Sequence, residues 1–502
     1  MQATRSTLGF GDVWSLASLA LLAIGLLVRA ALYFPLAMFQ IDSDAVLSGL
    51  CAFRVAAGEH PLFFPGGTRL GAASCYLSAG YFHLFGQGRV ALDLTSLTWG
   101  ALYLIFTLLF LRAVLGNKLA CVAFVFAVFP SEQFMTVSYA PWAYGEIMAS
   151  CAATLWLAAL WRNQGAFWQR LCFGLSLGIG LWFSLQTLMI ALPAIVWVAL
   201  RRRGAMGGES LAAVFGAIAG ATPFLAGNVS RGYPSLTANW ASRPVANLPQ
   251  AWDNFVWLIS YMLPKLLFGS SGWWSETTLL IAAYAVAAVG FALALRRNGR
   301  DVAPLLLLVA VACISFFSLS YAGSNRGWTV RYIAPIYVVV PLFLGMGAAA
   351  LWHRSKALST ATVVALLIPN LLLYGLPGSA LRADLTRQLS YETQLLRVLS
   401  ADRIQMVYGD YFLVYDLNFD SGERVAGVPS APVVDYFSYG PKLMTAPVRW
   451  ALLGGKDEVE RLASHAGAHG KLLPNGQLWL FVSDRQAPNV QQLLAELRRS
   501  GD

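Results

Sequence analysis

Long apolar runs separated by short basic loops constrain this chain more than any other feature. Of its 502 residues, 57% are hydrophobic and only 12% are charged. A soluble domain carries about 25% charged residues. Since about 17–25 apolar residues suffice to cross a bilayer as a helix, the pattern indicates an integral membrane protein with many spans.

We predict about eleven transmembrane helices. The predicted spans are Val13–Phe34, Leu92–Leu115, Leu119–Phe129, Ala143–Trp161, Leu171–Ser184, Thr187–Leu200, Leu211–Ala226, Thr277–Leu295, Val302–Ser320, Tyr332–Leu351 and Ala357–Leu376. Lys and Arg fall in alternate loops, which places those loops and the N-terminus in the cytoplasm and the C-terminus outside. The net charge of +10 therefore reflects topology, because no stretch resembles a nucleic-acid groove.

Three long segments fall on the opposite side of the membrane. Residues 1–376 are predicted to form the transmembrane domain with outer loops 35–93 and 228–275, and residues 377–502 a soluble α/β domain. The first loop holds a predicted interfacial helix, Ala72–Phe85. The tail holds four predicted strands, at Ile404–Tyr408, Arg424–Val428, Arg449–Leu453 and Gln477–Val482.

Cysteine usage gives no metal site. The six cysteines include no CxxC pair and no Cys/His cluster with metal-ligand spacing. Cys51 and Cys75 share the first outer loop, where a disulfide and two free thiols are both open alternatives. The other cysteines fall in or beside apolar runs and are interpreted as packing residues.

Carboxylates near the outer surface are the first candidate catalytic groups. Asp42 and Asp44 follow the first span, and Glu146 stands at the outer start of a later one. A partly desolvated carboxylate is a better proton acceptor. The alternatives are solvated loop acids for the Asp pair and a helix N-terminal acid favoured by the dipole for Glu146.

Cations on the outer side are the second group. Arg326 and Arg331 flank the outer start of Tyr332–Leu351, and Lys265 lies in the second outer loop. Binding a phosphate would explain them, since a guanidinium matches two phosphate oxygens. The alternative is snorkelling to lipid head groups. Arg29, deep in the first run, is expected to pair with an acid on a neighbouring helix.

Aromatic and histidine side chains complete the candidates. The second outer loop is rich in Trp, including Trp240, which is typical of an interfacial belt and also of stacking on sugar rings. His60 is a single histidine of the first outer loop. No Walker loop, placed GxGxxG, HExxH or GxSxG motif occurs, so a donor substrate would have to be anchored in the lipid rather than be a free nucleotide.

Several stretches resemble the GT-C class of membrane glycosyltransferases, nearest to the family 39-like protein mannosyltransferase and aminoarabinose transferase type. They come in the family's order along nearly the whole chain. The resembling stretches are Gly58–Gly66 ("G-x-H-P-L-F-F-x-G"), Leu70-Gly71 with Tyr76-Leu77, Tyr144-Gly145-Glu146 ("Y-P-E"), Arg331-Tyr332 with Pro335 ("R-Y-x-x-P"), and Tyr408–Phe412 with Tyr415 ("Y-A-D-Y-W").

Two positions depart from the family pattern. The family's acidic pair is usually adjacent, as Asp-Glu, whereas here Ser43 separates Asp42 from Asp44. Ser74 stands where the family often has Glu after the Leu-Gly. The second carboxylate role is therefore either moved to Glu146 or lost.

The resemblance implies transfer of a hexosyl or pentosyl group from a polyprenyl-phosphate donor to a hydroxyl of a cell-envelope glycan, lipid or protein. Asp44 or Asp42 would be the base, with inversion, and Arg331, Lys265 and Arg326 would bind the donor phosphate. His60, Tyr144 and Trp240 would line the acceptor side. It also implies a multi-pass protein of the bacterial inner membrane with a periplasmic tail. No cofactor is implied, and a divalent metal stays open as an alternative. The alternatives are a lipid-linked glycan flippase or exporter and a surface-glycan polymerase or ligase.

Overall fold

The computed structural model divides the chain into two compact units, which are described separately. Unit 1 comprises Met1–Leu32, Arg69–Gly71 and Ser96–Leu376, and unit 2 comprises Tyr33–Thr68, Ala72–Thr95 and Pro377–Asp502. The predicted domain boundary at residue 377 stays a prediction. The structure describes residues 13–37, 43–64, 70–139, 144–163, 165–202, 206–230, 232–233, 235, 246–268, 274–297, 302–319, 330–375, 393–430, 447–475, 478–484, 486–487, 492–494 and 497.

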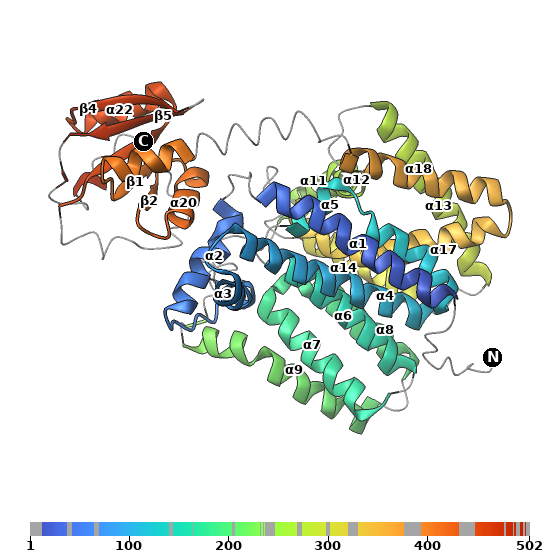
Figure 1. The fold of residues 1–502 in the computed structure, drawn as a ribbon. Coiled ribbons are helices and arrows are strands. Elements are labelled where there is room, and N and C mark those ends of the chain that lie inside the picture. The colour runs from blue at the N-terminus through green and yellow to red at the C-terminus, as the bar shows by residue number, and fades with distance from the viewer. Residues whose placement is uncertain are drawn as a thin grey trace. The chain divides into compact units, whose positions relative to one another are not determined.

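Unit 1 is a bundle of apolar helices (Figure 1). Its helices include the greater part of α1 (Val13–Ala37) and of α4 (Arg89–Val128), whose remaining residues belong to unit 2. The others are α5 (Glu132–Tyr139), α6 (Tyr144–Asn163), α7 (Phe167–Phe183), η1 (Leu185–Thr187), α8 (Leu188–Arg201), α9 (Met206–Val229), α11 (Leu248–Trp257), η2 (Leu258–Met262), α12 (Leu263–Phe268), α13 (Trp274–Arg297), α14 (Ala303–Leu319), α16 (Val330–Ile333), η4 (Ala334–Val338), α17 (Val340–Trp352) and α18 (Lys356–Gly375). The predicted outer loop 228–275 is therefore partly helical, through α11, η2 and α12.

The predicted count of eleven membrane spans is not confirmed. By length and hydropathy, three helices of the described chain can cross a membrane: parts of α1, α4 and α9. The bent pair Arg331–Val338 and Val340–Trp352, with an angle of 45°, would be a fourth. Shorter apolar helices occupy several other predicted runs, including Ala303–Leu319 and Lys356–Ile368.

Helix α4 turns back on itself at Gly116, where φ is +74°. A Cβ built on Gly25 of α1 would lie 2.9 Å from Leu104 and 3.3 Å from Val128. These two residues would be about 36 Å apart in one straight helix. Their common neighbour means that the two arms of α4 run side by side, as the separate runs Leu92–Leu115 and Leu119–Phe129 predicted.

Helices α7 and α9 approach one another through glycine pairs. A Cβ at Gly174 or Gly178 would lie 1.8 or 2.2 Å from a carbonyl oxygen of α9. Likewise, a Cβ at Gly216 or Gly220 would lie 2.2 or 2.4 Å from a carbonyl oxygen of α7. Both pairs have the Gly-xxx-Gly spacing that lets membrane helices pack backbone to backbone.

Arg29 corrects one expectation, because its partners are carbonyls instead of an acid. The side chain is 1% exposed. Its Nη2 donates to Ala127 O at 3.1 Å, and its Nη1 donates to Val128 O at 3.4 Å and Gly25 O at 3.3 Å. A cation next to the last carbonyls of a helix satisfies acceptors that have no partner within the helix, so Arg29 stabilises the end of α4.

Unit 2 contains a mixed five-stranded sheet of order β2-β1-β3-β5-β4. Its strands are β1 (Met406–Gly409), β2 (Ala426–Pro429), β3 (Trp450–Gly454), β4 (Gly470–Asn475) and β5 (Leu478–Ser483). β1 pairs parallel with β2 and β3, while β5 pairs antiparallel with β3 and β4. The four predicted strands are confirmed; β4 was missed.

Alternation along the strands builds a core on each face of this sheet. Met406, Tyr408, Trp450 and Leu452 pack in one cluster that also includes residues of α22 (Lys456–His465). Their neighbours Val407, Ala451 and Leu453 belong to a second cluster, with Val414 and Leu417 of α20 (Tyr411–Asp420).

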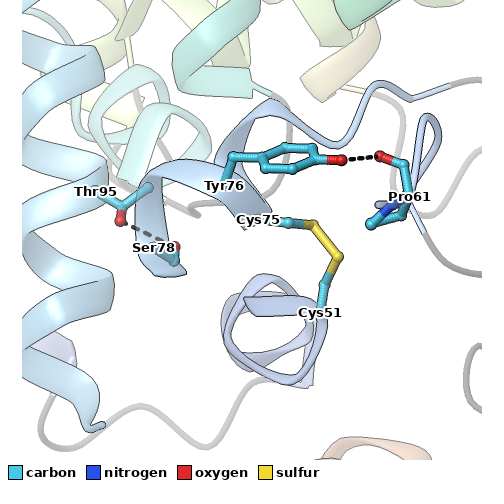
Figure 2. Close-up of a disulfide and its surroundings, with 6 residues drawn as sticks. All are labelled: Cys51, Pro61, Cys75, Tyr76, Ser78 and Thr95. Carbon is cyan, nitrogen blue, oxygen red and sulfur yellow. Dashed lines mark hydrogen bonds between the residues drawn. A yellow bond between two sulfur atoms is a disulfide. The ribbon is translucent and has the colours of Figure 1, made fainter. Parts of the chain in front are cut away.

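Helices α2 (Ser43–Ala56) and α3 (Ala73–Phe85) also belong to unit 2. The predicted interfacial helix Ala72–Phe85 coincides with α3. A disulfide joins Cys51 of α2 to Cys75 of α3, with both residues fully buried (Figure 2). Beside it, the Tyr76 hydroxyl donates to Pro61 O at 3.0 Å. These contacts close the segment between the two helices.

Candidate functional site

In unit 1, the helices α5, α6 and α16 pack around η4 and the short helix α12. α12 packs against α5 and α16, and α6 packs against α5 and η4. In Figure 1, α5 and α12 can be followed in the same part of the helical bundle. This convergence matters because it brings together four residues singled out from the sequence: Tyr144, Glu146, Lys265 and Arg331.

Ser131 fixes the start of α5. Its hydroxyl accepts a hydrogen bond from Phe134 N at 3.2 Å, the usual N-cap arrangement, and donates to Leu266 O of α12. Its backbone N–H donates to the Tyr337 hydroxyl of η4 at 3.0 Å. One serine thus links three elements that are distant in sequence.

An aromatic stack supports the same place. The Phe134 ring lies 4.2 Å from the Tyr337 ring, centroid to centroid, and 5.5 Å from the Tyr103 ring of α4. All three side chains are buried. Rigid packing under a polar surface is what a positioned site requires. Sequence analysis missed these residues, although Pro130-Ser131-Glu132 carries a helix-capping signal.

Glu146 is 1% exposed in the first turn of α6. Gly145 lets the start of α6 lie close to Trp99 and Ser138, because a Cβ at this position would be 2.9 Å from Trp99 Cβ and 3.3 Å from Ser138 O. Burying a carboxylate is costly unless its surroundings favour the charge, and the N-terminal end of a helix does so. The helix dipole therefore accounts for the burial of the Glu146 carboxylate, and this carboxylate is still available for a chemical role.

Arg331 lies beside Tyr144 at the start of the same helix α6. The guanidinium carbon is 5.9 Å from the Tyr144 ring centroid and 5.6 Å from that of Tyr332. Such distances allow attraction between the cation and the ring faces. The structure thus brings together Arg331 and the Tyr144–Glu146 stretch, which are far apart in the sequence.

Lys265 supplies a second cation on a neighbouring element. Its Nζ donates to the Tyr261 hydroxyl at 3.2 Å and lies 5.4 Å from that ring's centroid. The side chain is half-buried. Lys265 on α12 and Arg331 on α16 lie on packed elements, so their charges act on one region of unit 1.

The remaining candidate residues lie in unit 2 or outside the described residues. Asp44 stands in the first turn of α2, and its side chain is not among the described parts. His60 is exposed, in the segment that the disulfide closes. Asp42, Trp240 and Arg326 lie outside the described residues.

Helix α2, which carries Asp44, is held by the tail of the chain. The Phe53 ring stacks on Phe419 of α20 at 5.4 Å and lies 5.2 Å from Phe82 of α3. A Cβ at Gly49 would lie 2.3 Å from the Phe419 ring, so only glycine lets α20 approach this closely. No local signal in the sequence links residues 49 and 419.

Among the described residues, no group of three or more His, Cys, Asp or Glu side chains is placed to hold a metal ion.

The fold is that of the GT-C class of membrane glycosyltransferases. It is similar to ArnT, an aminoarabinose transferase, from Cupriavidus metallidurans bound to undecaprenyl phosphate, with a TM-score of 0.63, 12% sequence identity, and coverage of 92% of this chain and 97% of that one. It is also similar to the Archaeoglobus fulgidus oligosaccharyltransferase in complex with Zn and sulfate, with a TM-score of 0.51 at 10% identity, over 96% of this chain and 76% of that one.

By sequence, no family model and no curated protein matches the chain. The likeness to these two proteins therefore lies in the fold alone, at 12% sequence identity or less.

Proposed function

We propose that the protein transfers a glycosyl group from a polyprenyl-phosphate-linked donor to a hydroxyl of a cell-envelope acceptor. The observation that carries the proposal is the convergence of Arg331, Lys265 and the Tyr144–Glu146 stretch at adjoining helix ends. The solved structure with undecaprenyl phosphate, whose fold this chain shares, supports a lipid phosphate as the ligand.

In the proposed reaction, Asp44, or Asp42, takes the proton of the acceptor hydroxyl. The acceptor oxygen forms a bond to the anomeric carbon as the bond from that carbon to the phosphate oxygen breaks. A single displacement of this kind inverts the anomeric configuration. The polyprenyl phosphate leaves as an anion, which Arg331, Lys265 and Arg326 stabilise.

Glu146 is assigned a supporting role. Its carboxylate stands two residues from Tyr144, whose ring faces the Arg331 guanidinium. We propose that Glu146 orients this cation or polar groups of the substrate. Tyr144, Trp240 and His60 are proposed acceptor contacts.

We further propose that the protein lies in the bacterial inner membrane with unit 2 in the periplasm. The Cys51–Cys75 disulfide supports this placement, because disulfides persist in oxidising compartments. The distribution of Lys and Arg supports a cytoplasmic N-terminus.

The test is incubation of the purified protein in vesicles with a labelled polyprenyl-phosphate sugar and envelope acceptors, without ATP. Labelled product supports transfer, and movement of the label across the bilayer without product supports a flippase. Asp44→Asn and Asp42→Asn should be prepared alongside, with Asp253→Asn of α11 as a matched control. The base assignment is wrong if both test variants transfer sugar at the wild-type rate.

A further inference from the structure

The chain directly before Lys265 forms a π turn, η2. The N–H of Leu263 donates to the carbonyl oxygen of Leu258, five residues earlier. Pro264 accounts for this irregularity, because proline has no N–H and its ring crowds the carbonyl four residues before it in a regular α-helix. Single π turns within helices are frequent at functional sites. The side chains that this turn brings together are therefore candidates for a role in the site.

Two aromatic rings and the Lys265 ammonium group form one connected set at the π turn. Trp257, Tyr261 and Lys265 are spaced four residues apart, which makes successive side chains of a helix neighbours. The Trp257 and Tyr261 rings stack, with 4.2 Å between centroids and 21° between planes. Lys265 Nζ donates to the Tyr261 hydroxyl at 3.2 Å. The stack thus holds the Tyr261 ring, and the Tyr261 hydroxyl holds the ammonium group.

This pair of Tyr261 and Lys265 has hydrogen-bond donors to spare. An ammonium group has three N–H donors, and among the described residues Lys265 uses one of them, on Tyr261. No ion pair of the described residues includes Lys265. The Tyr261 hydroxyl accepts from Lys265 and still has its own hydrogen to donate. Because Tyr261 is 38% exposed, a ligand can reach these donors.

The backbone beside Lys265 is fixed by Ser131. The Ser131 hydroxyl donates to the carbonyl oxygen of Leu266, which lies in the last turn of α12, where carbonyls have no partner within the helix. Both residues are fully buried. The Ser131 N–H donates to the hydroxyl of Tyr337 at 3.0 Å, in the element η4 that directly follows Arg331 and its helix α16. Ser131 therefore ties the segment of Lys265 to the segment of Arg331.

We infer that Tyr261 is a further phosphate-binding residue, which acts with Lys265 as one unit, and that Ser131 is the positioning residue of this unit. The ligand is the phosphate of the polyprenyl lipid. The inference rests on the proposed function, since it takes Lys265 and Arg331 as phosphate-binding residues. When the bond from the sugar to the phosphate breaks, the phosphate oxygen keeps the electron pair, and the Tyr261 hydroxyl donates to the negative charge that develops.

The experiment measures binding by the full chain in phosphatidylcholine nanodiscs. The two probes are undecaprenyl phosphate and undecaprenol, which has the same chain and no phosphate, and native mass spectrometry gives the Kd of each. Tyr261→Phe keeps the ring, and it should weaken binding of undecaprenyl phosphate about tenfold, the loss expected for one hydrogen bond to a charged group. Binding of undecaprenol should not change. Equal weakening of both probes, or of neither, would overturn the inference.

Ser260→Ala is the matched control for Tyr261→Phe. Ser260 lies beside Tyr261 in the same π turn, and its hydroxyl donates to the carbonyl oxygen of Val256 at 2.7 Å. The variant removes a hydroxyl from this turn without touching Lys265, so the Kd should change by less than about twofold. A loss as large as that of Tyr261→Phe would show that any disturbance of the turn weakens binding, and the inference would be wrong.

A double-mutant cycle tests whether Tyr261 and Lys265 act as one unit. Groups that act together have non-additive effects, so Tyr261→Phe should cost less than about threefold in a Lys265→Gln background. The full tenfold loss in that background would show that Tyr261 acts independently of Lys265 and would overturn the inference.

Ser131→Ala tests the positioning role. It should also weaken binding of undecaprenyl phosphate and leave that of undecaprenol unchanged. Ser359→Ala is its control, because the Ser359 hydroxyl likewise donates to a carbonyl of another helix, Ala348 O at 2.8 Å. If Ser131→Ala does not fold, Tyr337→Phe keeps the ring that stacks on Phe134 and removes only the acceptor of the Ser131 N–H. Phosphate binding at the wild-type level in Tyr337→Phe would contradict the role of Ser131.

Two more comparisons separate this inference from the proposed function. If neither Lys265→Gln nor Arg331→Gln weakens binding of undecaprenyl phosphate, the proposed phosphate site and the inference both fail. If both variants weaken it and Tyr261→Phe does not, only the inference fails. Phosphatidylglycerol added to the nanodiscs should not displace undecaprenyl phosphate; displacement at equal concentration would show a site for phospholipid headgroups and would overturn the inference.

Discussion

Arg89 and Asp420 form a two-pronged ion pair across 331 residues of sequence. Arg89 Nε donates to Asp420 Oδ1 at 3.0 Å, and its Nη2 donates to Oδ2. Arg89 Nη2 also lies 3.6 Å from Oδ1 of Asp416, a residue that is 2% exposed. The pair joins the beginning of α4 to α20 within unit 2 and so holds the tail to the segment that carries α2 and α3.

Replacing Asp420 with Asn should destabilise unit 2. The pair is largely buried, with side chains 13% and 17% exposed, and a charge-assisted contact of this kind contributes about 1–3 kcal/mol. Thermal unfolding with limited proteolysis of the tail would measure the change. Glu460→Gln is the control, because the Lys456–Glu460 pair is half-exposed and should be worth less than about 1 kcal/mol.

Replacing Arg331 with Gln should reduce sugar transfer about a hundredfold, the usual loss when one donor to the developing charge is removed. Arg331→Lys should recover part of the rate, because the charge stays while the fork is lost. Initial rates of label transfer provide the measurement. An Arg331→Gln enzyme as fast as one carrying Arg354→Gln, an exposed arginine, would contradict the assignment.

Replacing Tyr76 with Phe should cost about 1 kcal/mol, because it removes the hydrogen bond to Pro61 O. Burial raises the pKa of the Tyr76 phenol. The contribution of this hydrogen bond is therefore complete below the unfolded pKa of about 10 and is lost as the pH rises through the raised pKa. Unfolding curves from neutral to alkaline pH should converge for the two proteins; parallel curves would contradict this account.

Replacing Gly178 with Ala should separate α7 from α9. The new methyl group would lie 2.2 Å from Ala217 O, and relieving such a contact by backbone shifts costs about 1–3 kcal/mol. Gly80→Ala in α3 is the control, since no atom lies within 4 Å of its Cβ position, and it should be neutral or stabilising by up to about 1 kcal/mol. Tm values in detergent would distinguish the two.

Removing the disulfide with the double change Cys51→Ser and Cys75→Ser should destabilise unit 2 by about 2–4 kcal/mol. Cys172→Ser, a free cysteine of intermediate exposure, should have little effect. Thermal unfolding with and without reductant measures both. A wild-type protein whose Tm is unchanged by reductant would contradict a structural role for the Cys51–Cys75 bond.

Most of the individual residues of the candidate site could be predicted from the sequence, but their association in space could not. Tyr144, Glu146, Lys265 and Arg331 stood out because charges and motifs near span ends are unusual. Ser131 did not stand out as a linking residue, because its partners Leu266 and Tyr337 belong to elements that are 135 and 206 residues away.

The sequence by itself determined the membrane class, most helices and four of the five strands, because apolar periodicity and charge placement are local properties of the chain. Only the tertiary structure decided that Arg29 caps the end of α4, that Ser131 binds Leu266 and Tyr337, and that Arg89 binds Asp420. Each of these contacts depends on which elements pack together. A hydrogen-bond donor or a cation can pair equally well with many groups of the chain, and only the packing of the fold brings one of them within reach.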